Sequence, residues 1–138
     1  FLELRELARG CITRPTVRHY QGFARGRRKR LREPAPTVKH LLYAYRVLLS
    51  GIHLMRCGEV LADVNELNRE AGIAAIEELV ARKAAGAEQL LLRDGELALH
   101  ERALDALEEE LERAHARSAL PDEPRDLPAL EDFVVRAR

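Results

Sequence analysis

The sequence has little of what small metal-bound or disulfide-bonded folds use. In 138 residues it contains no Trp, three Tyr, three Phe and two cysteines. Cys11 and Cys57 are far apart, and neither has a second Cys or a His beside it at metal-site spacing. The sequence therefore predicts no zinc site and no disulfide framework, and two free thiols favour a reducing, cytoplasmic location.

Long apolar runs are also missing. No stretch approaches the roughly 20 apolar residues that a helix needs to cross a bilayer, and no signal-peptide pattern opens the chain. We therefore expect no membrane partner. Phe1, not Met, begins a segment that already has helical spacing, so we expect the sequence to be part of a longer chain.

The usual combinations of catalytic side chains are absent too. The only serines are Ser50 and Ser118, and no Ser or Cys comes with an evident base and orienting acid. The five histidines are scattered, and no Gly-rich phosphate loop occurs. The carboxylates of residues 108–112 are more typical of a solvated helix face than of an acid/base pair. We expect no catalytic residue and no metal ligand in this chain, which leaves a binding surface.

Residues typical of helices are abundant. Leu, Ala, Glu and Arg dominate, whereas the β-branched and aromatic residues that sheets favour are few. The sequence therefore predicts an all-α fold, with about five to seven helices around a central helix over 38–57. At this length we expect one helical domain over 1–138. Within it we distinguish a basic helical half (1–57), an acidic helical half (58–117) and a proline-rich turn with a terminal helix (118–138).

The charge is divided unevenly between the halves. The formal net charge is zero, yet residues 1–56 carry thirteen Lys or Arg and three Glu, so this half has +10 and the remainder −10. Clustered cations attract phosphate-bearing molecules through long-range electrostatics. The first half is therefore expected to bind an anionic partner. The alternative is that the basic half docks on the acidic half, or on an acidic domain elsewhere.

The densest basic run lies in a helix predicted to begin near Thr13 and Pro15 and to end near residue 32. Lys and Arg side chains of this kind bind nucleic-acid phosphates, and a solvated surface run is an equally good interpretation. The predicted nucleic-acid-binding residues are Arg25, Arg27, Arg28, Lys29 and Arg30.

The predicted central helix over 38–57 has three faces. Thr37 is its expected cap and Gly58 its expected terminator. An apolar stripe faces the core, and a second side with Gly51 is small enough for another helix to come close. At about 100° per residue, a third, polar band can line a cleft. A Lys with an Arg on one band can hold a triphosphate through charge and forked hydrogen bonds. The predicted nucleotide-binding residues are Lys39, Tyr43, Arg46 and His53.

The acidic half is predicted to contain further helices. Apolar spacing and turn residues indicate helices over 64–70, 73–83, 96–117 and 127–138. Gly86 is expected to interrupt the second of these segments. The stretch 87–92 is ambiguous, because a short helix and a buried extended piece have the same pattern.

Several stretches together resemble one known family. They are Tyr-Gln-Gly-Phe-Ala at 20–24, Lys-His-Leu-Leu-Tyr-Ala-Tyr-Arg-Val-Leu-Leu at 39–49, Gly-Glu-Val at 58–60, Glu-Leu-Val-Ala-Arg-Lys at 78–83 with Glu88, and Ser-Ala-Leu-Pro at 118–121. In this order and spacing they resemble the C-terminal helical region of predicted nucleotidyltransferases of the DNA-polymerase-β-like superfamily, the group that includes RNA-ligase-associated members.

The resemblance implies a division of labour in a larger α+β enzyme. In that family a preceding mixed sheet carries a Gly-Ser pair and an Asp-x-Asp motif, whose carboxylates hold two Mg²⁺ ions. This sequence has neither motif. The resemblance therefore implies that Mg²⁺ and the catalytic carboxylates belong to a domain upstream or to a partner chain. It also implies that the helical part closes the nucleotide cleft, with Lys39, Tyr43 and Arg46 facing the nucleotide.

The expected function is thus that of a helical domain that binds a nucleoside triphosphate or nucleic acid for a nucleotidyltransferase. Two alternatives stay open at this point. One is a non-enzymatic adaptor or antitoxin-like subunit whose basic half covers an acidic protein surface. The other is a free-standing nucleic-acid-binding module.

Overall fold

The computed structural model describes residues 2–87, 91–125 and 127–137. Within these ranges the chain forms seven α-helices and no strand, which confirms the predicted all-α fold. The helices are α1 (Leu2–Gly10), α2 (Val17–Arg32), α3 (Val38–Cys57), α4 (Val64–Ala71), α5 (Ala74–Arg82), α6 (Glu96–Arg117) and α7 (Leu127–Ala137).

The central helix α3 has the predicted boundaries because both ends are capped locally. Thr37 has an extended backbone, and its hydroxyl accepts a hydrogen bond from the His40 amide at 3.3 Å. At the other end Gly58 adopts a left-handed conformation with φ of +70°, and its amide donates to the Leu54 carbonyl at 2.8 Å. A side chain at position 58 would be strained, so glycine ends the helix here.

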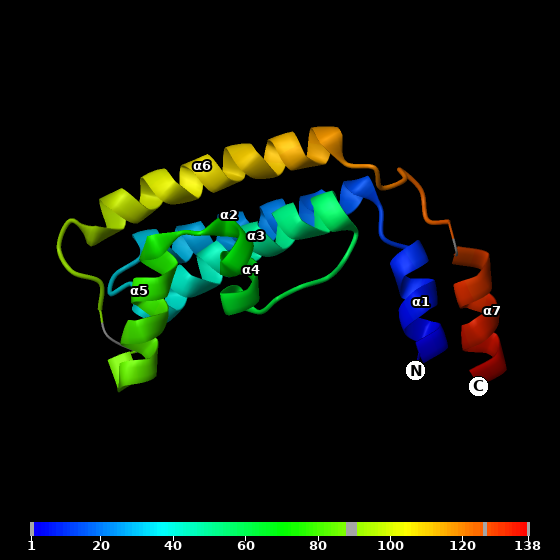
Figure 1. Ribbon diagram of the computed structural model, residues 1–138, viewed down its shortest axis with the longest axis horizontal. Coiled ribbons are helices and arrows are strands. Elements are labelled where there is room, and N and C mark those ends of the chain that lie inside the picture. The colour runs from blue at the N-terminus through cyan, green and yellow to red at the C-terminus, as the bar shows by residue number, and fades with distance from the viewer. Residues whose placement is uncertain (1, 88–90, 126, 138) are drawn as a thin grey trace.

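Helix α3 also forms the centre of the core. Its apolar stripe is buried, as predicted, and α2, α4, α5 and α6 all pack against it. Figure 1 shows α6 lying lengthwise over α2 and α3. Gly51 lies where these three helices come closest: a Cβ there would be 3.0 Å from Cβ of Tyr20 and 3.1 Å from a methyl group of Leu111. The predicted close approach of another helix at this side is confirmed.

Other boundaries differ slightly from those expected. The helix predicted from residue 15 begins at Val17, because residues 14–16 form a 3₁₀ turn in which Pro15 lies. Helix α5 ends at Arg82, and a wider helical turn over 83–87 contains Gly86 with φ of +84°. Beyond it Leu91 pairs with Thr37 in an isolated antiparallel bridge, which favours an extended end for the ambiguous stretch. Glu88 lies outside the described residues.

The two terminal helices form a separate pair. Helices α1 and α7 lie side by side at one end of the molecule, beyond the end of α6 (Figure 1). The Arg136 guanidinium donates to Glu3 at 2.9 Å, and the Arg125 amide donates to the Gly10 carbonyl at 2.9 Å. None of the helices in the described ranges is long and apolar enough to cross a membrane.

Candidate functional site

Helices α2 and α3 run antiparallel, and their register decides which polar residues meet. Tyr20 of α2 packs against Gly51 of α3. Seven residues later in α2, the Arg27 guanidinium lies 5.3 Å from the ring centroid of Tyr43, eight residues earlier in α3. The antiparallel pairing therefore brings part of the predicted basic run onto the predicted polar band of α3.

Tyr43 is the centre of a group of cations. Besides Arg27, the Lys39 ammonium lies 5.7 Å and the Arg46 guanidinium 4.9 Å from the ring centroid. All three are within the range of cation–π attraction, which offsets part of their mutual repulsion. We call these four residues the Tyr43 cluster. The predicted proximity of Lys39, Tyr43 and Arg46 is confirmed, and Arg27 is an addition that only the fold reveals.

The Tyr43 cluster carries positive charge that the protein does not neutralise nearby. Within the described residues, no carboxylate forms an ion pair with Arg27, Lys39 or Arg46. The positive charge affects the neighbouring His40. Burial lowers the pKa of His40, and the charges of Arg30, Lys39 and Arg27 lower it further. Arg30 lies at the edge of the cluster, where the Glu33 carboxylate is 3.7 Å away. A region of this kind is suited to an anionic ligand.

The polar band does not continue as one surface to its predicted end. Ser50 is buried, and its hydroxyl donates a hydrogen bond of 2.7 Å to the Leu61 carbonyl. The connection after α3 thus covers this turn of the helix. His53 is half-buried and lies about 10 Å farther along the helix axis than Arg46. The structure therefore does not bring His53 to the Tyr43 cluster.

Arg28 requires a correction, because the predicted basic run divides between two flanks of α2. The Arg28 side chain is only 8% exposed and lies against α6. Its guanidinium is 3.0 Å from Glu101, 2.6 Å from Asp105 and 3.1 Å from Glu108. Burial alone would lower the pKa of this guanidinium, but hydrogen bonds to the carboxylates raise it. We remove Arg28 from the predicted nucleic-acid-binding residues, because it is buried and both of its terminal NH2 groups already bind acids of α6.

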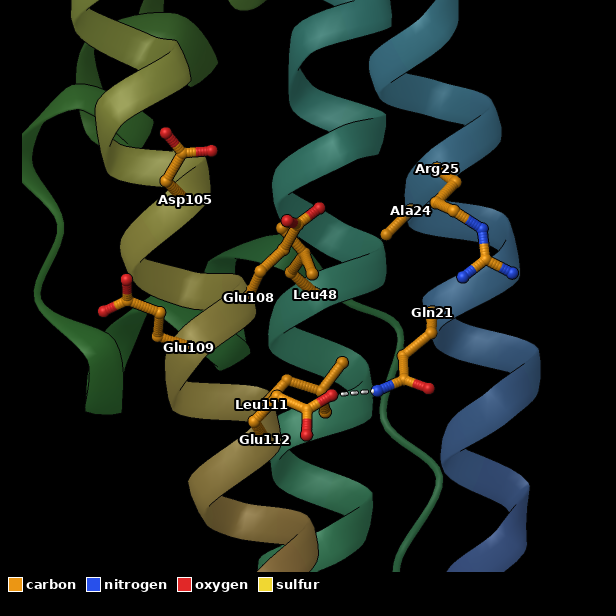
Figure 2. A pocket seen from close by; sticks show the side chains of 9 residues that line it. All are labelled: Gln21, Ala24, Arg25, Leu48, Asp105, Glu108, Glu109, Leu111 and Glu112. Carbon is orange, nitrogen blue, oxygen red and sulfur yellow. Dashed lines mark hydrogen bonds between the residues drawn. The ribbon is translucent and has the colours of Figure 1, made fainter.

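Arg25 lies on the α6 flank of α2, but its guanidinium is turned along α2, away from the acids of α6 (Figure 2). It lines a groove of about 550 Å³ between the two helices, whose other polar walls are four carboxylates of α6 and Gln21 (Figure 2). There the Gln21 side chain donates to Glu112 at 2.6 Å. Arg25 and Lys29 are both exposed. Phosphate binding by Arg25 therefore stays a prediction.

The alternative explanation of the charge asymmetry is therefore correct in part. Cations of the basic half pair with α6 across the core: Arg28 as above, Arg32 with Glu101 at 3.7 Å, and Arg56 with Glu110. This pairing covers one side of the basic half. Within the described residues, these ion pairs do not involve the cations of the Tyr43 cluster.

A buried polar chain links α3, α5 and α6, and sequence spacing did not reveal it. The Tyr45 hydroxyl and Nδ1 of His100 are 2.7 Å apart, and Nε2 of His100 is 3.8 Å from Glu96, which also binds Arg82. Burial raises the pKa of Tyr45 to about 12 and lowers that of His100. These groups lie in the protein interior, so we assign them to stability. The Tyr45–His100 and Arg82–Glu96 links join residues 55 and 14 positions apart, which no local pattern connects, whereas Glu96 and His100 are one turn apart in α6.

The buried His100 leads to a prediction about how the stability of the protein depends on pH. The folded His100 has a pKa below the ordinary 6.5, so below about pH 6.5 the unfolded chain binds more protons than the folded one. The free energy of unfolding should therefore fall as the pH decreases from 6.5 toward the folded pKa, and should level off above 6.5. Urea unfolding across this range measures the effect.

His40 also has a lowered pKa, so a variant at this second histidine is the control. His100→Gln should flatten the pH dependence by removing its share, and His40→Gln should remove a separate share. If His100→Gln showed the same pH dependence as the original sequence, the loss would belong to His40 or to the carboxylates.

The metal expected of a complete enzyme can be compared with the side chains present. In the part of the chain that the structure describes, no three His, Cys, Asp or Glu side chains gather as a metal site. The closest group of acids, Glu101, Asp105 and Glu108, converges on Arg28. These residues do not fit the two Mg²⁺ ions that the resemblance implies, so we assign no metal ligand and derive no catalytic step from them.

Comparison with known proteins gives one match, to a family. The model of the RNA repair pathway DNA polymerase beta family matches residues 1–136. No curated protein matches the chain, and no solved structure does. The family match includes the whole of α2 and α3, which carry the Tyr43 cluster, and it agrees with the resemblance drawn from the sequence. This chain therefore belongs to the RNA repair pathway DNA polymerase beta family, within the DNA-polymerase-β-like nucleotidyltransferases.

Proposed function

We propose that this helical domain serves a nucleotidyltransferase by holding the phosphates of a nucleoside triphosphate or a nucleic acid at the Tyr43 cluster. The observation that carries the proposal is the convergence of Arg27, Lys39 and Arg46 within 6 Å of one tyrosine ring. Family membership supports it, because nucleotidyl transfer requires a bound phosphate chain.

The chemistry of the three cations suits phosphate oxygens. A guanidinium presents paired N–H donors that match two oxygens of one phosphate, and an ammonium adds a compact charge that can turn toward any of them. Arg27 belongs to α2, and Lys39, Tyr43 and Arg46 belong to α3, so the two helices together hold the cations around one ring. Because the ring attracts all three cations, they are gathered before the ligand arrives, which reduces the entropy lost on binding.

In this proposal the catalytic carboxylates and their Mg²⁺ lie outside these 138 residues, in another domain or a partner chain. Two-metal nucleotidyl transfer needs acidic ligands that flank the reacting phosphate. The acids of α6 are engaged with Arg28, Arg32 and Arg56 instead. We also propose a reducing, cytoplasmic setting, in which the free thiols of Cys11 and Cys57 persist.

The test is a phosphate-binding measurement on the 138-residue chain. With a fluorescent ATP analogue and a labelled oligonucleotide as probes, Arg46→Ala or Lys39→Ala should weaken binding by about 10- to 150-fold, since a hydrogen bond to a charged group contributes roughly 1.5 to 3 kcal/mol. Each lost contact should also reduce the slope of log affinity against log salt by about one.

Arg25→Ala is the matched control for this measurement. It removes the same charge from the other flank of α2, which faces the acids of α6, so it should change affinity much less than Arg46→Ala. If the two variants weakened binding equally, only net charge would matter and the cluster would not be a site. If neither probe bound, the basic surface would be better explained by an acidic protein partner.

A further inference from the structure

Phe23 is an aromatic side chain that the core does not use. It lies on α2 and is 60% exposed, although burying such a ring would stabilise the fold. Its neighbour Ala24 faces the core and is 2% exposed. An exposed ring on its own needs no explanation, but its surroundings here are specific.

Phe23 lies on the same flank of α2 as the Tyr43 cluster. Four residues separate it from Arg27, which places the two side chains about 40° apart around the helix and about 6 Å apart along it. The antiparallel register defined by Tyr20–Gly51 and Arg27–Tyr43 puts Phe23 beside the turn of α3 that contains Arg46 and Val47. One exposed ring therefore lies on the flank of α2 that carries the Tyr43 cluster, one helical turn from Arg27.

The two aromatic rings of this surface have different roles. Tyr43 is half-buried and is surrounded by cations, so its ring is already engaged. In the described part of the chain, no other ring and no cation contacts Phe23. Phe23 can therefore accept a planar group from outside.

We infer that this surface binds single-stranded nucleic acid, with the backbone phosphates at the Tyr43 cluster and an unpaired base stacked on Phe23. Proteins that bind single strands without sequence preference combine a cationic track with an exposed aromatic ring in this way. The bases of a duplex are already stacked on one another, so they are not available to Phe23. The inference rests on the proposed function and adds the kind of ligand to it.

The lack of tryptophan in the chain allows a direct test. Phe23→Trp provides a single indole at the stacking position, and its fluorescence should be quenched by oligouridylate and by oligodeoxythymidylate. An abasic strand of the same length should quench it much less, because it carries the same phosphates without bases.

Affinity measurements on the same strands complete the test. Phe23→Ala should weaken binding of the single strands by about 5- to 150-fold, the range that corresponds to loss of one stacked base, and should leave the affinity for the abasic strand unchanged. Leu99→Ala is the matched control, because Leu99 is a similarly exposed apolar residue, 69% exposed, on α6. Circular dichroism melting shows whether both variants keep the fold.

The outcomes separate this inference from the proposed function. If Phe23→Ala bound single strands as well as the original sequence while Arg46→Ala did not, the phosphate site would stand and the stacking role would be wrong. Duplex binding as tight as single-strand binding would also overturn the inference. Binding of either single strand supports the inference. The strand that binds more tightly, RNA or DNA, indicates which of the two is the natural ligand.

Discussion

Arg28→Ala should lower the free energy of unfolding by about 3 to 5 kcal/mol, the range for removing one partner from a buried ion pair. The guanidinium is buried between α2 and α6 and holds Glu101, Asp105 and Glu108 together. Without it, three carboxylates on neighbouring turns of α6 repel one another, and a cavity opens where the side chain lay. Urea unfolding at neutral pH measures the loss.

Arg27→Ala is the matched control, one position away. Arg27 is exposed and forms no ion pair within the described residues, so its loss should change stability by no more than about 0.5 kcal/mol. Phosphate affinity should show the opposite pattern, with a large loss for Arg27→Ala and a small one for Arg28→Ala. If Arg28→Ala kept full stability and lost nucleic-acid affinity, the original prediction for the whole basic run would be right and the correction wrong.

The contrast between these neighbours shows what the sequence could not predict. A run of basic residues looks uniform in the sequence, but successive residues on a helix point about 100° apart. Arg27 therefore faces Tyr43 while Arg28 faces α6. The periodicity gives the angle between them, yet it does not say which flank α6 will cover. That depends on a contact between positions 73 residues apart.

Features set by local chemistry were predicted well. The cap at Thr37 and the left-handed turn at Gly58 depend on residues within one helical turn, and so does the grouping of Lys39, Tyr43 and Arg46. The predicted polar band is interrupted at Ser50, because the connection after α3 folds back and buries this side chain. This burial could not be read from the spacing within α3, whereas the distance of about 10 Å between His53 and Arg46 along the helix axis follows from that spacing.

The core of α3 provides the second large effect. Leu41→Ala should lower the free energy of unfolding by about 2 to 5 kcal/mol, because Leu41 is 0% exposed and truncation leaves a cavity among packed neighbours. Under conditions in which the Leu41→Ala variant is still folded, its affinity for the phosphate probes should stay close to that of the original sequence.

Lys39→Ala, two residues away, should have the reverse effects. Lys39 is half-buried, and its ammonium contacts the Tyr43 ring at the surface, so its removal creates no core cavity and should leave the melting temperature within a few degrees. Its phosphate affinity should fall. Because one helix carries both residues, a general disturbance of α3 would impair stability and binding together in both variants. If Lys39→Ala lowered the melting temperature as much as Leu41→Ala and left affinity unchanged, the Tyr43 cluster would be a structural element of the α2–α3 junction and not a binding site.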